Sequence, residues 1–131
     1  MTSLQLSARL AILGAILLVV LETIRRYHQM SDPAMFTSWF DDYLISGFLI
    51  YGVWRTRRDP ARGQLYLCAA WGAATVMMIL SFIGQLQHIG GPDPAPVPSW
   101  AVLLIKGLLL IGAVTGLLLA LRKQNQPGGK P

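Results

Sequence analysis

Long apolar runs alternate with short polar stretches along this chain of 131 residues. A membrane-spanning helix needs roughly 20 mainly apolar residues. Four stretches approach that length: 10–27, 43–54, 64–86 and 100–121. The second is short unless the residues from Trp39 onward are counted with it. The pattern predicts an all-α integral membrane protein, a four-helix up-down bundle over residues 1–123 that is followed by a disordered cytoplasmic tail at 124–131.

The composition agrees with a membrane environment. Hydrophobic residues make up 53% of the chain and charged residues only 13%, against about 25% charged in a typical soluble domain. The net charge of +5 would suit nucleic acid, but the basic residues cluster at helix ends and form no stripe along one face. We therefore expect the lipid bilayer as the partner of this chain, and no nucleic acid. The single cysteine, Cys68, can form neither an internal disulfide nor a metal cluster.

The distribution of lysine and arginine predicts the orientation. Positive residues accumulate on the cytoplasmic side of a membrane. With four spans, one side carries Arg9, Arg55, Arg57, Arg58, Arg62, Arg122, Lys123 and Lys130, and the other carries Arg25 and Arg26. Both termini are therefore predicted to be cytoplasmic. No small-x-small cleavage site follows the first apolar run, so we expect that run to be retained. The Ala/Gly/Leu/Arg-rich composition is typical of bacteria, and the expected location is the bacterial inner membrane.

Helical spacing places three polar side chains on faces that should meet other helices. At about 100° per residue, Glu22 shares a face with Leu18 and Ala15, and small residues mark surfaces where membrane helices pack closely. A small, weakly polar stripe on the third predicted helix ends at Gln85. On the fourth predicted helix, Lys106 lies on the same side as several small residues that come later in that helix. All three polar side chains are predicted to point into the bundle.

Two short motifs predict local features. Ser38 followed by Asp41 fits the capping pattern at a helix start. Gly112 and Gly116 form a GxxxG pattern that is typical of close helix pairs in membranes. Both residue pairs are read directly from the chain.

Most ionisable groups that are not cytoplasmic anchors should meet in one layer at the outer end of the bundle. A lone charge within the bilayer costs about 2.5–3.5 kcal/mol, so such groups pair, reach the interface or line a wet cavity. The layer predicts a ligand-binding set: Glu22, Arg25, Arg26, Asp41, Asp42, Tyr43, Gln85 and Lys106. There are two alternatives: a structural polar cluster that orders the bundle without any ligand, and charged side chains that only extend to an ordinary membrane interface.

Three functional interpretations remain open from the residues. The first is a small non-enzymatic membrane protein whose outward-facing polar pocket binds a small ligand or ion, or which serves as an accessory subunit of a larger membrane partner. The second is a minimal proton-coupled transporter that works as a homo-oligomer and titrates Glu22. The third is a haem- or metal-binding redox protein that uses His28 and His88. Enzymatic chemistry has no support, since no Gly-rich phosphate loop, nucleophile elbow or HExxH motif occurs.

In size, number of predicted spans and the presence of one acid in the first helix, the chain superficially resembles the small multidrug-resistance transporters. Those proteins carry their acid in mid-helix, whereas Glu22 lies near a helix end. The Asp41-Asp42 pair and the proline-rich stretch before Trp100 also depart from their pattern. Their function is therefore not transferred to this chain.

Overall fold

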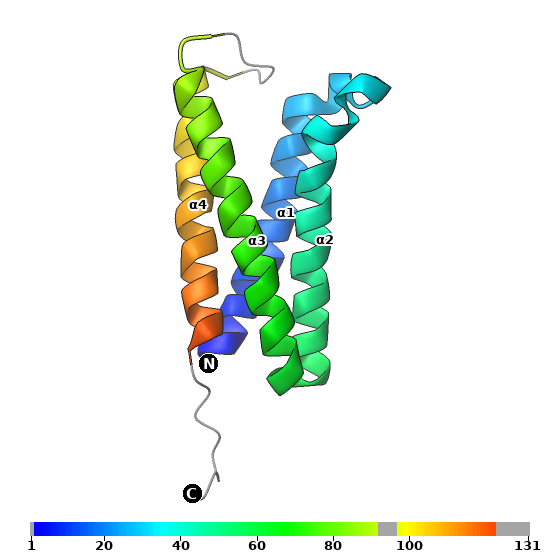
Figure 1. Ribbon diagram of the computed structural model, residues 1–131, viewed down its shortest axis with the longest axis vertical. Helices are drawn as coiled ribbons and strands as arrows, with labels where there is room; N and C mark the ends of the chain where they lie inside the picture. Colours follow the sequence, from blue (N-terminus) through cyan, green and yellow to red (C-terminus); the bar gives the residue numbers. More distant parts are fainter. Residues whose placement is uncertain (1, 92–96, 123–131) are drawn as a thin grey trace, which may run out of the picture.

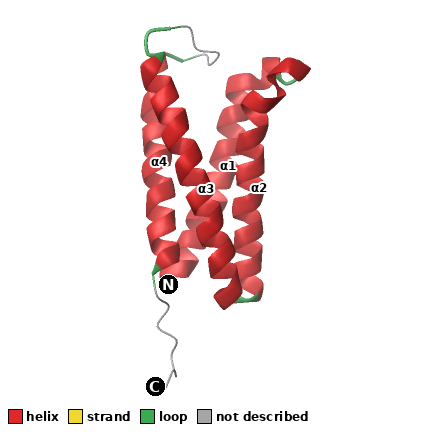
Figure 2. Cartoon of the chain, in the orientation of Figure 1, coloured by secondary structure: helices red, strands yellow, loops and turns green. Residues whose placement is uncertain are grey.

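Four long α-helices make up most of the chain that the structure describes (Figure 1). The computed structural model describes residues 2–91 and 97–122, and at positions 29, 35 and 38 it describes the backbone alone. The helices are α1 (Ser3–Arg26), α2 (Phe36–Arg58), α3 (Pro60–Gln87) and α4 (Ser99–Leu121), and the short 3-10 helices η1 (Tyr27–Gln29) and η2 (Pro33–Met35) join α1 to α2. Within the described residues the chain contains no strand (Figure 2). The predicted all-α class is confirmed.

Three of the four helices, α1, α3 and α4, are long and apolar enough to cross a membrane. Helix α2 has 23 residues, as many as α4, but aspartates lie near its start and three arginines lie in its last turn. These charges make α2 less apolar than the other helices. Many large apolar side chains face away from the bundle, among them Leu65, Leu80, Leu108 and Ile111. Such a surface suits a lipid environment rather than water.

Helix α1 begins earlier than the first apolar run predicts. The hydroxyl of Thr2 accepts a hydrogen bond from the backbone N–H of Gln5 at 3.1 Å, and the side-chain oxygen of Gln5 accepts one from the backbone N–H of Thr2 at 3.1 Å. This reciprocal capping box satisfies two N–H groups that a helix start leaves without partners. Residues 3–9 are helical for this reason, although they are less apolar than the run that follows.

The predicted cap at Ser38 is wrong. Helix α2 begins at Phe36, so Ser38 already lies inside the helix. The start is prepared upstream, where the carboxylate of Asp32 accepts a hydrogen bond from the backbone N–H of Ala34 at 3.0 Å and Pro33 occupies the first position of η2. Proline is preorganised for a first helical position, and η2 leads directly into α2.

The helices form a ring in which α1 packs on α2, α2 on α3, α3 on α4, and α4 on α1. The start of α1, the end of α4 and the α2–α3 connection lie together at one end, the closed end (Figure 1). The end of α1, the start of α2, the end of α3 and the start of α4 form the opposite end, the open end. Toward it, α1 and α2 diverge from α3 and α4 (Figure 1).

Helices α2 and α3 touch through their backbones at the closed end. Only Asp59 separates them, and its side chain accepts a hydrogen bond from the backbone N–H of Arg62 at 3.4 Å. A Cβ atom on Gly63 would lie 2.2 Å from the Cα of Thr56. Because no side chain fits there, a glycine is required for this tight connection.

A buried junction ties α1, α3 and α4 together near the closed end. The indole Nε1 of Trp71 donates a hydrogen bond to Ser7 Oγ at 2.9 Å, and Ser7 Oγ donates one to the backbone carbonyl of Gly116 at 2.8 Å. A Cβ atom on Gly116 would lie 2.3 Å from the Trp71 ring. By contrast, nothing lies within 4 Å of the Cβ position of Gly112. Only the second glycine of the GxxxG pattern therefore makes a close contact, which is with the Trp71 indole. The two glycines are not equivalent.

We expect Gly116→Ala to destabilise the protein by about 1–3 kcal/mol, because its methyl group overpacks the Trp71 ring. Gly112→Ala is the matched control on the same helix, and it should be neutral or stabilising since alanine favours a helix by up to about 1 kcal/mol over glycine. Thermal unfolding of the detergent-purified variants, followed by circular dichroism, measures both effects. Equal unfolding midpoints for the two variants would contradict the indole contact.

Candidate functional site

Glu22 is the buried acid of helix α1. It is 8% exposed and continues the buried stripe of Ala11, Ala15 and Leu18, as the helical spacing predicted. Its carboxylate oxygen Oε1 lies 2.5 Å from Nε of Arg26. The other oxygen lies 3.9 Å from Arg25. The last turn of α1 thus supplies the positive charge that offsets a carboxylate placed inside the bundle.

Asp42 brings a second acid to Glu22 from helix α2. The two carboxyl groups are in hydrogen-bonding contact, and the ammonium of Lys106 attracts Asp42. Two acids from neighbouring helices therefore meet at the open end of the bundle.

Lys106 reaches this region from the opposite wall. Its Nζ donates to Gln85 Oε1 at 3.2 Å and to the backbone carbonyl of Ser81 at 3.4 Å. The amide nitrogen of Gln85 donates to Ser99 Oγ at 2.9 Å. Gln85 is 7% exposed, and its two amide ends hold the lysine of α4 against the last turns of α3. The ammonium is positioned by neutral acceptors on its own wall and faces acids on the other.

These groups surround one cavity of about 180 Å³ at the open end. Its ionisable lining consists of Glu22, Arg25, Asp42 and Lys106, which come from three helices. Eight of its thirteen lining residues are apolar, and Ser81 is the remaining one. The cavity is therefore amphipathic, with a small number of charged groups set into apolar walls.

A second cavity, of about 310 Å³, lies between α1 and α4. All fourteen residues that line it are apolar, including Gly14, Trp71 and Gly112. This space, the apolar slot, was not predicted from the sequence. The two glycines are the signal that could have indicated it, because each removes a side chain from a wall of the space. Since GxxxG patterns are usually interpreted as close packing, Gly112 was assigned to a helix contact instead.

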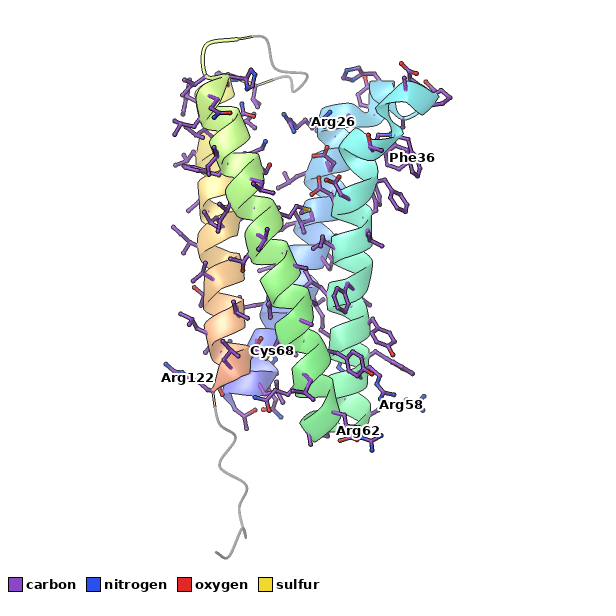
Figure 3. All side chains as sticks on the ribbon, in the orientation of Figure 1. Arg26, Phe36, Arg58, Arg62, Cys68 and Arg122 are labelled. Carbon is purple, nitrogen blue, oxygen red and sulfur yellow. The ribbon has the colours of Figure 1, made fainter. Side chains whose placement is uncertain are left out.

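The structure brings four of the eight predicted ligand-binding residues into the lining of the charged cavity, and two more contact that lining. Arg26 pairs with Glu22, and Gln85 accepts from Lys106. Figure 3 shows Arg26 at the open end, whereas Arg58, Arg62 and Arg122 lie at the closed end.

Asp41 and Tyr43 lie elsewhere. Asp41 is exposed, because it precedes Asp42 by about 100° around the helix. The hydroxyl of Tyr43 is hydrogen-bonded to Thr23 Oγ1, which donates to the carbonyl of Val19 at 2.6 Å. Thr23 was not predicted from the sequence. Tyr43 and Thr23 join α1 to α2 beside the cavity and do not line it.

His28 and His88 follow the ends of α1 and α3 and are both exposed. Figure 1 shows these two helix ends on opposite sides of the open end. The His28 ring packs edge-on against Tyr27 at 5.6 Å between centroids, and Nδ1 of His88 contacts the carbonyl of Gly84 at 2.8 Å. No group of three or more His, Cys, Asp or Glu residues that could hold a metal ion occurs among the described residues. Each histidine is thus engaged by its own part of the chain.

The arrangement can bind a small charged group. A cation and an acid pair lie on opposite walls of one small space, and apolar walls strengthen electrostatic contacts within it. Comparison of the chain with protein-family models, with curated proteins and with solved structures finds no match.

Proposed function

We propose that this chain is a non-enzymatic membrane protein that binds a small charged ligand in the cavity at the open end. The observation that carries the proposal is the convergence of Glu22, Arg25, Asp42 and Lys106 on one cavity of about 180 Å³. Ligand sites are typically concave and mainly apolar, with a few placed polar groups that fix orientation. Ionisable residues at membrane depth commonly mark ligand or ion paths. An accessory subunit of a larger membrane partner could use the same cavity.

The proposed topology is a four-span up-down bundle in a bacterial inner membrane, with both termini cytoplasmic and the open end outward. Helix α2 is taken as the fourth span because it matches α4 in length and packs along α1 and α3. The orientation is supported by Arg55, Arg57, Arg58 and Arg62, which flank the α2–α3 connection at the closed end, as expected for a cytoplasmic loop. The open end carries acids beside its cations.

Reporter fusions test this topology. A green fluorescent protein attached after the last residue should fluoresce, and alkaline phosphatase at the same place should be inactive, because the C-terminus is proposed to be cytoplasmic. Phosphatase inserted after Asp32, in the α1–α2 connection, should be active. The reverse pattern at both positions would overturn the orientation. Equal activity at both would overturn the odd number of spans, α2, α3 and α4, that is proposed to separate them.

Ligand binding is tested by native mass spectrometry of protein extracted from its host membrane in a mild detergent. We expect an adduct of constant mass on the wild type, and its loss in Lys106→Met, because this change removes the ammonium but keeps a long side chain. Arg57→Gln, an exposed change at the closed end, is the matched control and should keep the adduct. Absence of any adduct on the wild type, or its retention in a folded Lys106→Met variant, would contradict the proposal.

A second candidate is a proton-coupled transporter that works as a homo-oligomer. The proximity of the carboxyl groups of Glu22 and Asp42 favours it, because two interacting acids can take up or release a proton as a pair when a ligand changes the local charge. In the first candidate no proton is transferred.

Resistance of expressing cells to a panel of toxic compounds separates the two candidates. If the protein couples transport to protons, Glu22→Gln should abolish any resistance that the wild type confers, since glutamine cannot exchange a proton. Asp41→Asn, a change at the neighbouring exposed acid, should leave resistance intact. Resistance that survives Glu22→Gln at equal expression would exclude Glu22 as the coupling group.

A further inference from the structure

The charged cavity and the apolar slot adjoin one another. Four residues line both spaces: Leu18, Met78, Ile105 and Leu109. Taken together, the two spaces run from ionisable groups at the open end to a wholly apolar region between α1 and α4. We propose, on the basis of the ligand-binding function proposed above, that the ligand is an anionic amphiphile with one carboxylate or phosphate head and a single apolar chain.

The charges at the open end favour an anionic head. Three cations, Arg25, Arg26 and Lys106, meet two acids there, Glu22 and Asp42. The formal charge of these five groups is +1, and the neighbouring Asp41 is exposed and does not line the cavity. Arg25 and Lys106 line the cavity itself, from α1 and from α4. A carboxylate or phosphate between them can accept charge-assisted hydrogen bonds from both walls, which are the stronger kind.

The shape of the slot favours a single chain. Its wall on α1 extends from Leu18 back to Leu10, and the distance along α1 from Glu22 to Leu10 is roughly 18 Å at 1.5 Å per residue. Its floor includes Trp71, whose ring is held by Ser7 and Gly116. Gly112 leaves the wall on α4 without a side chain. These features form a narrow apolar path directly beneath the charged groups.

The slot is accessible from the side. Leu13 and Leu108, which line it from α1 and α4, are 53% and 61% exposed. In a membrane this mouth faces the acyl chains of the lipids. An amphiphile can therefore slide in from the bilayer with its chain in the slot and its head in the charged cavity, without first entering water.

The position of Trp71 on the floor provides a direct readout. A variant with Trp39, Trp54 and Trp100 replaced by phenylalanine keeps Trp71 as the single tryptophan. In neutral detergent micelles, stearic acid brominated in mid-chain should quench its fluorescence saturably, since bromine quenches on contact. The methyl ester of the same acid, which lacks the charge, measures non-specific quenching within the micelle. Quenching equal to that of the ester would overturn the proposed anionic site.

Two glycine variants test whether the apolar chain of the ligand occupies the slot. Gly112→Leu places a side chain in the slot and should weaken binding of the brominated acid about tenfold or more, because it occupies the volume of the chain. Gly72→Leu is the matched control, since nothing lies within 4 Å of either Cβ position and Gly72 does not line the slot. Unchanged binding in a folded Gly112→Leu variant would refute a chain in this slot.

Binding of the ligand's anionic head group is tested separately. Lys106→Met and Arg25→Gln should each weaken binding of the acid roughly tenfold, as expected for the loss of a hydrogen bond to a charged group. A brominated alkyl phosphate should bind like the acid, and a brominated alkyltrimethylammonium of equal chain length should not. Preference for the ammonium compound would mean that the cavity binds a cationic head group, and it would overturn the proposal. Circular dichroism and thermal midpoints verify that each variant is folded.

Short anions separate this inference from the proposed function. If butyrate competes with the brominated acid but Gly112→Leu has no effect, the charged cavity binds ligands and only the amphiphile is wrong. If neither butyrate nor any brominated compound binds in a way that depends on Lys106, the ligand-binding function itself fails.

Discussion

The junction of Ser7, Trp71 and Gly116 is the constraint on which the remaining arrangement depends. Lipid chains are as apolar as the side chains of the helices, so membrane helices associate through close packing and hydrogen bonds rather than through the hydrophobic effect. Here an indole rests on a residue without a side chain, and its N–H is satisfied by a serine that in turn donates to a helix carbonyl. Three helices are held together by one fully satisfied set of polar groups.

The open end differs from the closed end in the side chains that lie between its helices. Large and charged side chains occupy the positions where alanines and glycines pack near the closed end, and the helix pairs α1–α2 and α3–α4 diverge there (Figure 1). The carboxyl groups of Glu22 and Asp42 lie on one wall and the ammonium of Lys106 on the other. Glu22 and Lys106 each have a partner on their own wall, Arg26 and Gln85 respectively. These partners lower the large cost of placing a charge in apolar surroundings.

The two proposed functions, ligand binding and proton coupling, draw on the same few groups. Glu22 and Asp42 lie close together, and Lys106 and the two arginines place positive charge beside them. The continuity with the slot between α1 and α4 adds a length of apolar wall beside the charges. The ligand proposed above matches this arrangement, because it is itself half charged and half apolar.

The amino-acid sequence by itself determined the helical class and the inward-facing positions of Glu22, Gln85 and Lys106. These features depend on the rise and rotation of a single helix, which are the same in every helix. The tertiary structure alone decided that Gly116 receives the Trp71 ring while Gly112 borders a cavity, that Asp42 rather than Asp41 faces Glu22, and that Tyr43 bonds to Thr23 outside the cavity. Each of these depends on how one helix is rotated and spaced against another, and that is set by contacts between residues far apart in the chain.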